Sequence, residues 1–297
     1  MEGRNLNMQK IFNFMRKYKR YIWGIFILTT YISINIYCSY HCLSVTKQDV
    51  ETDKLISPIT IVQLTDIHSS IFGKENKILI SQIEKNAPDI IVISGDIINS
   101  NDANSKIMQM KSLLSKLACI APVYISMGNQ EIEYMESTGN DLKKLFSEEN
   151  VIVLDKEYRD IMVKGQQLRI GGVYGYCLPE RYESNEDEVG FLREFEMTDS
   201  YKILLSHLPY AWTTYGFTSD YDIDLIFTGH VHGGQVILPF VGGLYDPEVG
   251  FFPGELKGIH NENNTVVALS SGLGSDTEGL PRFNNIPEIV VLRITSE

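Results

Sequence analysis

The sequence predicts a layered α/β domain, in which two stacked β-sheets lie between outer helices, preceded by one membrane-spanning helix. Three observations predict this fold. A segment without charged residues runs from Tyr21 to Thr46, strands and helices alternate from Pro58 to Ser126, and short strands with few helices follow residue 150. Such alternation is typical of α/β proteins, and a run of short strands favours stacked sheets. With 297 residues, 43% of them hydrophobic, the chain is long enough to bury a large core without disulfides.

The N-terminal region has the charge pattern of a membrane anchor. Residues 1–20 contain six basic side chains and one acidic one, and the apolar segment after them is long enough to cross a bilayer as a helix. Basic residues before such a segment predict a cytoplasmic N-terminus. We therefore expect a basic cytoplasmic N-terminus over 1–20, a single-pass transmembrane anchor over 21–42, a polar tether over 43–57, and an extracytoplasmic domain over 58–297 at the cell membrane. A cleaved signal peptide is the alternative.

The rest of the chain is acidic, with 20 Lys and Arg against 37 Asp and Glu. Nucleic-acid binding depends on basic side chains that neutralise phosphates, so no nucleic-acid partner is expected. An anionic small substrate is still compatible with this charge, because bound metal cations reverse the local field. The four cysteines follow no metal-binding spacing. Cys119 is expected to be a small buried residue.

The first half of the domain reads as β-α-β-α-β. Residues 59–65 are rich in β-branched side chains and predict a strand, and the apolar run over 89–94 predicts a fully buried one. Apolar residues at helical spacing predict helices over 74–88 and 104–120. A third strand is expected over 122–126.

The second half consists mostly of strands. Short apolar runs between turn residues predict strands over 151–155, 161–175, 201–207, 222–230, 234–240, 265–272 and 287–295. The sequence shows no internal repeat and no boundary between domains. Two stacked sheets with helices outside satisfy both halves.

Metal-ligand residue types follow five of the predicted strands. They are Asp66, His68, Asp96, Asn129, His207, His230 and His232. Loops at the carboxyl edge of an α/β sheet are where ligands usually bind. An Asp-x-His pair or a Gly-Asp turn alone is weak evidence, because each is more often an ordinary loop. The ordered set is strong evidence, and the pair of histidines in 'GHVHGG' serves little packing purpose.

This donor set predicts a dinuclear metal site. Two Asp, one Asn and four His are too many for one ion and suit two ions that share a bridging carboxylate. Nitrogen and oxygen donors without thiolate favour manganese, iron or zinc over calcium or magnesium. Two such ions, about 3.5–4 Å apart, lower the pKa of a water between them and hold a phosphoryl group during in-line displacement.

The motifs 'DIH', 'GD', 'GN', 'H' and 'GHVHGGQ', in that order, resemble the calcineurin-like metallophosphoesterase superfamily. The tail from Gly272 to Ile294 resembles its membrane-anchored or exported branch, and the whole resemblance begins near Pro58. It implies a β-sandwich flanked by helices and hydrolysis of phosphoester or phosphoanhydride bonds through a metal-bridging hydroxide. The implied ligands are Asp66, His68, Asp96 and His232 for one ion, and Asp96, Asn129, His207 and His230 for the other, with Asp96 bridging. The implied catalytic residues are Asp96, Asn129 and Gln130.

One position departs from the family pattern. Family members commonly have His after Gly-Asn, whereas this chain reads Gly128-Asn129-Gln130-Glu131. A Gln amide donates a hydrogen bond but no proton near neutral pH, and loss of a general acid costs about 10²–10⁴-fold when the leaving group is poor. We therefore expect Gln130 to contact phosphate, and the substrate to have a good leaving group, as in a nucleotide- or lipid-linked pyrophosphate or a phosphodiester. The alternative is a catalytically weak or silent module that binds phosphorylated lipid or cell-wall polymer.

Two further residues lie near these motifs. Arg282 in 'LPRFNN' is a candidate for bidentate binding of substrate phosphate, although a surface ion pair is the more common role of a single Arg. Glu131 is not expected to replace the missing acid, since a carboxyl is usually ionised at neutral pH. The expected partners are a phosphorylated small-molecule or lipid substrate and the membrane.

Overall fold

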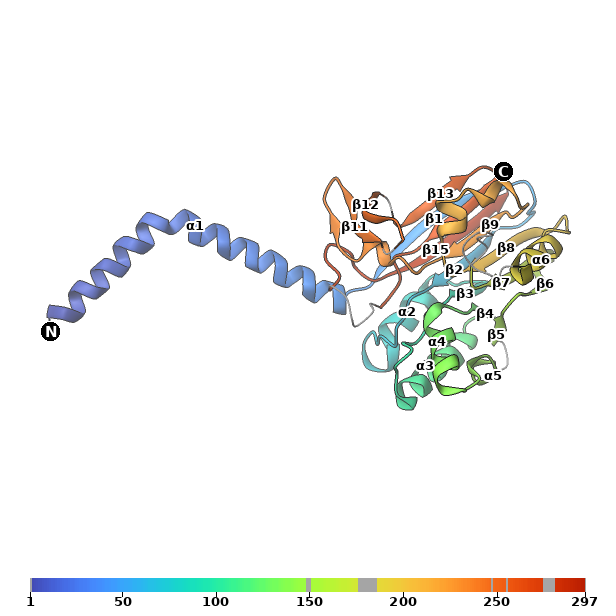
Figure 1. Cartoon of the computed structure of the whole chain (residues 1–297), viewed down its shortest axis with the longest axis horizontal. Coiled ribbons are helices and arrows are strands. Elements are labelled where there is room, and N and C mark those ends of the chain that lie inside the picture. Colours follow the sequence, from blue (N-terminus) through green and yellow to red (C-terminus); the bar gives the residue numbers. More distant parts are fainter. Residues whose placement is uncertain are drawn as a thin grey trace.

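A computed structural model describes residues 2–147, 151–175, 186–246, 248–254, 256–274 and 281–296. One long helix, α1 (Glu2–His41), projects from a folded body that begins with β1 (Ser44–Thr52) (Figure 1). The stretch Arg16–His41 of α1 is long and apolar enough to cross a membrane, with a mean hydropathy of 1.4. The expected strand–helix alternation and the expected N-terminal apolar helix are both confirmed.

The first of two six-stranded sheets has the order β1-β15-β2-β3-β4-β5. The strands other than β1 are β2 (Ile59–Leu64), β3 (Ile90–Ser94), β4 (Val123–Ser126), β5 (Val151–Leu154) and β15 (Glu288–Ser296). Strands β2 to β5 are parallel, so their carboxyl ends share one edge. Strand β15 is antiparallel to β2 and parallel to β1.

The second sheet has the order β13-β14-β9-β8-β7-β6. Its strands are β6 (Glu157–Val163), β7 (Gln166–Val173), β8 (Tyr201–Ser206), β9 (Leu225–Thr228), β13 (Gly258–Glu262) and β14 (Thr265–Leu269). Strands β7, β8, β9 and β14 are parallel. A small third sheet joins β10 (Ile237–Leu238), β11 (Gly242–Asp246) and β12 (Gly250–Gly254).

The two large sheets face each other, and helices cover their outer faces. Along β3, Ile90 and Val92 belong to the core between the sheets, while Ile91 and Ile93 belong to the core under the helices. A strand buried on both faces has a continuous apolar sequence, which is why this run predicts a strand so clearly. The helices are α2 (Lys77–Lys85), α3 (Asn104–Ala118), α4 (Asn129–Thr138) and α5 (Leu142–Phe146) on the first sheet and α6 (Glu186–Phe195) and α7 (Tyr210–Thr213) on the second. The residues that the structure describes also form three short 3₁₀ turns: Lys74–Asn76, Phe217–Ser219 and His232–Gly234.

Two expectations from the sequence are wrong. The tether over 43–57 is largely strand β1, which pairs with β15 along its whole length. The sequence of β1 is polar because β1 lies at the sheet edge, where charged side chains limit pairing with other chains. A polar strand of this kind lacks the apolar pattern from which a strand is predicted. Cys119 is exposed rather than buried, because it follows the last turn of α3. Cys177 lies outside the described residues.

Strand register places α1 and the loops that carry the candidate ligands at the same edge of the body. The carboxyl end of β2 lies beside the start of β15, because Gln63 pairs with Val290. The start of β15 lies beside the start of β1, because Glu288 pairs with Ser44. Helix α1 ends three residues before Ser44. The loops that follow β2, β3 and β4 are therefore on the side of the body from which α1 leaves.

Candidate metal centre

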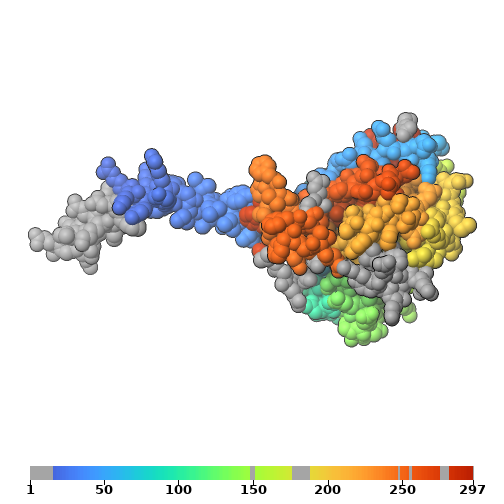
Figure 2. All heavy atoms as spheres, turned by 45° about the horizontal axis from the view of Figure 1, so that its top comes forward, coloured from blue at the N-terminus to red at the C-terminus, as the bar shows by residue number. Residues whose placement is uncertain are grey.

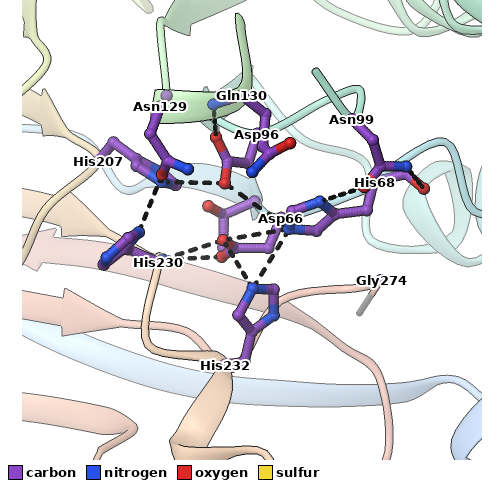
Figure 3. Close-up of polar contacts among 12 residues, drawn as sticks. Asp66, His68, Asp96, Asn99, Asn129, Gln130, His207, His230, His232 and Gly274 are labelled. Atoms are coloured by element: carbon purple, nitrogen blue, oxygen red, sulfur yellow. Dashed lines mark hydrogen bonds and ion pairs between the residues drawn. The ribbon is translucent and has the colours of Figure 1, made fainter. Parts of the chain in front are cut away.

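The structure brings together all seven metal ligands expected from the sequence (Figure 3). They form two groups, Asp66 with His68 and His232, and Asp96 with His207 and His230; within each group the donor atoms lie within 4.8 Å of one another. Asn129 joins the second group, since its Oδ1 lies 3.1 Å from His207 Nε2 and 3.0 Å from His230 Nδ1. Five loops from both large sheets thus meet at one point.

Asp96 lies between the two groups. Its Oδ2 is 3.3 Å from His207 Nε2 and 3.7 Å from His68 Nε2. A carboxylate in this position suits a bridge between two cations. The backbone N–H of Gln130 donates to the other oxygen, Oδ1, at 3.0 Å, which fixes the carboxylate plane (Figure 3).

Five of the ligands have unusual backbone conformations. Asp66, His68, Asp96, His230 and His232 have φ between 46° and 72°, in the left-handed region that non-glycine residues seldom adopt. Each such residue costs about 1–3 kcal/mol and persists only where the surroundings enforce it. Five of the side chains that converge on this centre are therefore carried on strained backbone.

Glycines allow the loops to approach this closely. A Cβ on Gly272 would lie 2.6 Å from the Cβ of Asp66, and one on Gly95 would lie 2.5 Å from His207 Nδ1. Both contacts are far shorter than van der Waals separation, and both glycines have positive φ. The glycines next to the ligands thus serve close backbone approach as well as turning.

Glu131 holds the loops of the first sheet together, a role that the sequence did not reveal. Its fully buried carboxylate accepts four backbone N–H groups, from Asp96, Ile97, Ile98 and Gly128, at 2.7–3.1 Å. Burial raises the pKa of Glu131 to about 6, while the hydrogen bonds favour the ionised form. The carboxylate is therefore a fixed acceptor at neutral pH. The signal in the sequence is an acidic residue three positions after Gly128, the spacing of a capping box.

Two histidines have their ring orientation set by oxygen acceptors. His207 Nδ1 lies 2.7 Å from the carbonyl of Ser94, which can only accept a hydrogen bond, so Nδ1 carries the proton and Nε2 faces the cluster. His68 Nδ1 lies 3.0 Å from Asn99 Oδ1, and Asn99 Nδ2 donates back to the carbonyl of His68. Such partners fix the ligand nitrogen and raise its basicity. Sequence reasoning did not identify Asn99.

Arg282 is buried and lies against the ring of His232. Only 1% of Arg282 is exposed. Its guanidinium donates to the carbonyls of Ser271 and Gly274, and its Nη2 lies 3.2 Å from His232 Nδ1. Burial lowers its pKa to about 10, which leaves it charged at neutral pH. These contacts argue against the expected binding of substrate phosphate by Arg282, and they also rule out an exposed surface ion pair.

Gln130 has one fixed atom and one available group. Its Oε1 accepts the backbone N–H of Ser100 at 2.7 Å. Because that N–H can only donate, the oxygen must face Ser100, and this settles the orientation of the amide. The side chain is half-buried beside Asp96 and Asn129 (Figure 3), with its NH₂ group as the remaining donor.

The electrostatics of the cluster fit bound cations. Burial raises the pKa of Asp66, and burial with nearby positive charge lowers the pKa of His230 to about 3. Burial also disfavours a charged His207, but Asp96 and Asp66 together raise its pKa to about 9. His68 Nε2 and His232 Nε2 lie only 3.2 Å apart, a distance at which two imidazole nitrogens need a proton or a cation between them. Buried carboxylates and converging imidazole nitrogens are thus donors that could hold metal ions.

The two-sheet fold and the paired ligand groups define a metal-dependent hydrolase. The family described as calcineurin-like phosphoesterase matches residues 59–234, and the chain belongs to that family. It is therefore a phosphoester hydrolase.

Its relatives carry corresponding names. The chain is 29% identical over 268 residues to the uncharacterized metallophosphoesterase YkuE of Bacillus subtilis, a match that covers 88% of each chain. It is 25% identical over 244 residues to the phosphodiesterase YaeI of Escherichia coli, a match that covers 80% of this chain and 83% of that one. Among solved structures, TT1561 of Thermus thermophilus has a TM-score of 0.45 at 14% identity, over 72% of this chain and 89% of that one.

Proposed function

We propose that the protein is a dinuclear metal-dependent phosphohydrolase that favours good leaving groups and acts at the outer face of the membrane. The position of Asp96 between the two ligand groups supports this most strongly. In this proposal one ion is held by Asp66, His68, Asp96 and His232, and the other by Asp96, Asn129, His207 and His230. The ions are manganese, iron or zinc, since the donors are nitrogen and oxygen.

Bound ions would supply a water of lowered pKa and neutralise charge on the phosphoryl group. The chain itself positions the reacting groups. Asn129 and Asp96 enter the site from the loops that Glu131 fastens, and Gln130 offers its NH₂ group to a phosphoryl oxygen. The carboxylates are buried in surroundings of low dielectric, which strengthens their interactions with charged groups in the site.

Gln130 restricts the substrate because it supplies no proton. Glu131 does not replace it, since both of its oxygens are bonded to backbone N–H groups. An alkoxide leaving group needs a general acid, whereas a phosphate leaving from a pyrophosphate is already a stable anion. We infer a preference for nucleotide- or lipid-linked pyrophosphates and for diesters with acidic leaving groups. The name phosphodiesterase carried by YaeI is consistent with a diester.

The test is a substrate panel for the full-length protein in detergent, loaded with manganese. Pyrophosphate diesters and aryl phosphodiesters should be cleaved, with alkyl monoesters at least about 100-fold slower. Asp96→Asn should abolish turnover. Asp155 is an exposed residue, and the control variant Asp155→Asn should not change turnover. Fast alkyl monoester cleavage would contradict the leaving-group argument, and activity of Asp96→Asn would contradict the site.

The alternative is a silent module that binds phosphorylated lipid or cell-wall polymer. The lack of a proton donor at Gln130 is the observation that favours it. The same panel decides between the two, because a silent module would bind two metal ions and turn over none of the substrates.

The cellular location is part of the proposal. Helix α1 would cross the membrane once, with the basic residues 1–20 in the cytoplasm and the body outside. Protease added to intact cells should then digest the body. Complete protection of the body would reverse this topology.

A further inference from the structure

Helix α1 does not merely lead to the body but packs against it. Tyr31 donates from its hydroxyl to Asn284 Oδ1 at 2.6 Å, and the backbone N–H of Asn284 donates to Asn35 Oδ1 at 3.0 Å. The ring of Tyr31 meets that of Phe283 edge-on, with centroids 5.8 Å apart. Polar side chains within a membrane helix need such partners. The contacts lie well inside the apolar part of α1 rather than at its end.

The position of these contacts along α1 has a consequence for the depth of the body. Tyr31 follows Arg20 by eleven residues, which is about 16 Å along a helix axis. The hydrocarbon core of a bilayer is about 30 Å thick. If the basic residues up to Arg20 mark the cytoplasmic boundary, the parts of the body beside Tyr31 and Asn35 lie at the depth of the opposite leaflet.

The part of the body at this depth is the three-stranded sheet. Asn284 Nδ2 donates to the carbonyl of Ile237 in β10, and Figures 1 and 2 both show β10–β12 beside the body end of α1. This sheet and its turns expose large apolar side chains: Phe240, Val241, Tyr245, Val249, Phe251 and Phe252. Phe251 is 72% exposed and lies against Tyr245 and Phe252. An exposed apolar patch next to a membrane helix fits a lipid surface.

The same small sheet is joined to the metal centre through residues 282–285. Arg282 contacts the His232 ring, and Asn285 Nδ2 donates to the His232 carbonyl at 2.6 Å. Phe283 pairs with the chain on either side of Val236, directly before β10. Four consecutive residues therefore link the anchor, the exposed sheet and a metal ligand.

We propose that the β10–β12 sheet inserts into the leaflet beside α1 and holds the metal centre at the lipid headgroups, so that its substrate is a phosphorylated lipid of that membrane. This deepens the proposed function and rests on it for the chemistry. The partner of the apolar sheet is the bilayer that α1 crosses. The ligand loops face that bilayer because they share the sheet edge from which α1 leaves.

Insertion is tested by fluorescence quenching on the full chain in lipid nanodiscs. Single cysteines in a chain whose native cysteines are serine carry an environment-sensitive fluorophore, and spin-labelled lipids quench it. Phe251→Cys should be quenched, whereas Met162→Cys should not. Met162 is a matched control because it is 66% exposed but lies on β6, the edge strand of the second sheet. Ile27→Cys, on α1, reports whether α1 lies in the lipid.

The outcomes separate the two claims. Quenching at positions 27 and 251 but not 162 supports the inference. Quenching at 27 alone overturns it and leaves the anchor intact, and no quenching at 27 removes the membrane premise itself.

A kinetic test uses two substrates. Phe251→Asp should slow cleavage of diacylglycerol pyrophosphate in vesicles by about tenfold or more, because a carboxylate resists insertion into lipid. The same substitution should leave cleavage of soluble bis(4-nitrophenyl) phosphate unchanged. The control substitution Met162→Asp should leave cleavage of both substrates unchanged. An equal loss on both substrates would mean that the sheet supports the site only structurally. Failure of the unmodified protein on both would instead contradict the proposed function.

Discussion

On the first-sheet side of the metal centre, the loops are tied to one another by side chains, whereas on the second-sheet side the histidines depend on the first sheet. Glu131 joins the loops after β3 and β4, and Asn99 holds His68. In contrast, His207 donates to the carbonyl of Ser94 at the end of β3, and the N–H of His230 donates to Asp66. The first sheet is thus the frame on which the second places its ligands.

This difference predicts how far the effects of a substitution should spread. If Asp96 bridges the two ions as proposed, damage to the frame should weaken both ion sites, because the histidines also depend on the neighbours of Asp96. Damage on the second-sheet side should weaken one site. The contrast can be measured as metal ions bound per chain.

The largest effect is expected for Glu131→Gln. An amide accepts through one oxygen only and turns its NH₂ toward backbone N–H groups that then lack a partner. Each unsatisfied buried donor costs about 1–3 kcal/mol, so a loss of roughly 2–5 kcal/mol of unfolding free energy is expected. Denaturant unfolding and elemental analysis should show lower stability and loss of both ions. Glu133 is exposed on the same helix, so Glu133→Gln should change neither the stability nor the number of bound ions. A Glu131→Gln protein that is as stable as the unmodified protein and binds two ions would contradict the role of Glu131 in holding these loops.

Asn99→Ala should have the next largest effect. It leaves His68 in place but removes the acceptor that orients the ring, a kind of change that typically costs about 10–100-fold in metal affinity. Competition titration with a metal chelator measures this. Asn101→Ala, on an exposed residue of the same loop, is the control. Equal affinity in both variants would mean that the ring of His68 is held by packing alone.

The sequence predicts which candidate ligands converge far better than it predicts the residues that support them. Asp66, Asp96 and His207 follow strands that are apolar and buried, so their positions at one sheet edge can be expected from strand order alone. The supports are different. Asn99 meets His68 across 31 positions, and no local pattern marks such a contact.

The sequence does not predict the edge strand β1 of the first sheet, for a related reason. Strand β1 is polar because it is half exposed, and its only signal would be the partner strand β15, which lies more than 200 positions away. For Arg282 the sequence offers only the bidentate donor geometry of a guanidinium, which suits a phosphate. The burial of Arg282 depends on carbonyls at Ser271 and Gly274 that only the folded chain brings together.

Arg282→Lys tests the second-sheet side. Lys keeps the positive charge but cannot donate to two carbonyls in one plane as the guanidinium does. We expect about tenfold weaker binding of the ion held by His232, with the other ion retained, so that elemental analysis shows nearer one ion than two. Arg293 is exposed on β15, and the control variant Arg293→Lys should retain both ions. A large rise in KM with both ions retained would instead restore the substrate role for Arg282.

The smallest effect is expected for Gln130→His, which changes a first-sheet loop but replaces no candidate metal ligand. The imidazole loses the bond to the Ser100 N–H but brings a group that can give up a proton. We expect alkyl ester turnover to rise by about tenfold, below the full gain from a positioned general acid because the ring is not oriented by a partner. Pyrophosphate turnover should change by less than about threefold, since its leaving group needs no proton. Gln130→Asn, which shortens the amide, is the control for disturbance of the loop and should raise neither rate. If Gln130→His raises both rates equally, the limitation set by Gln130 concerns phosphate binding and not protonation, and the preference for good leaving groups loses its basis.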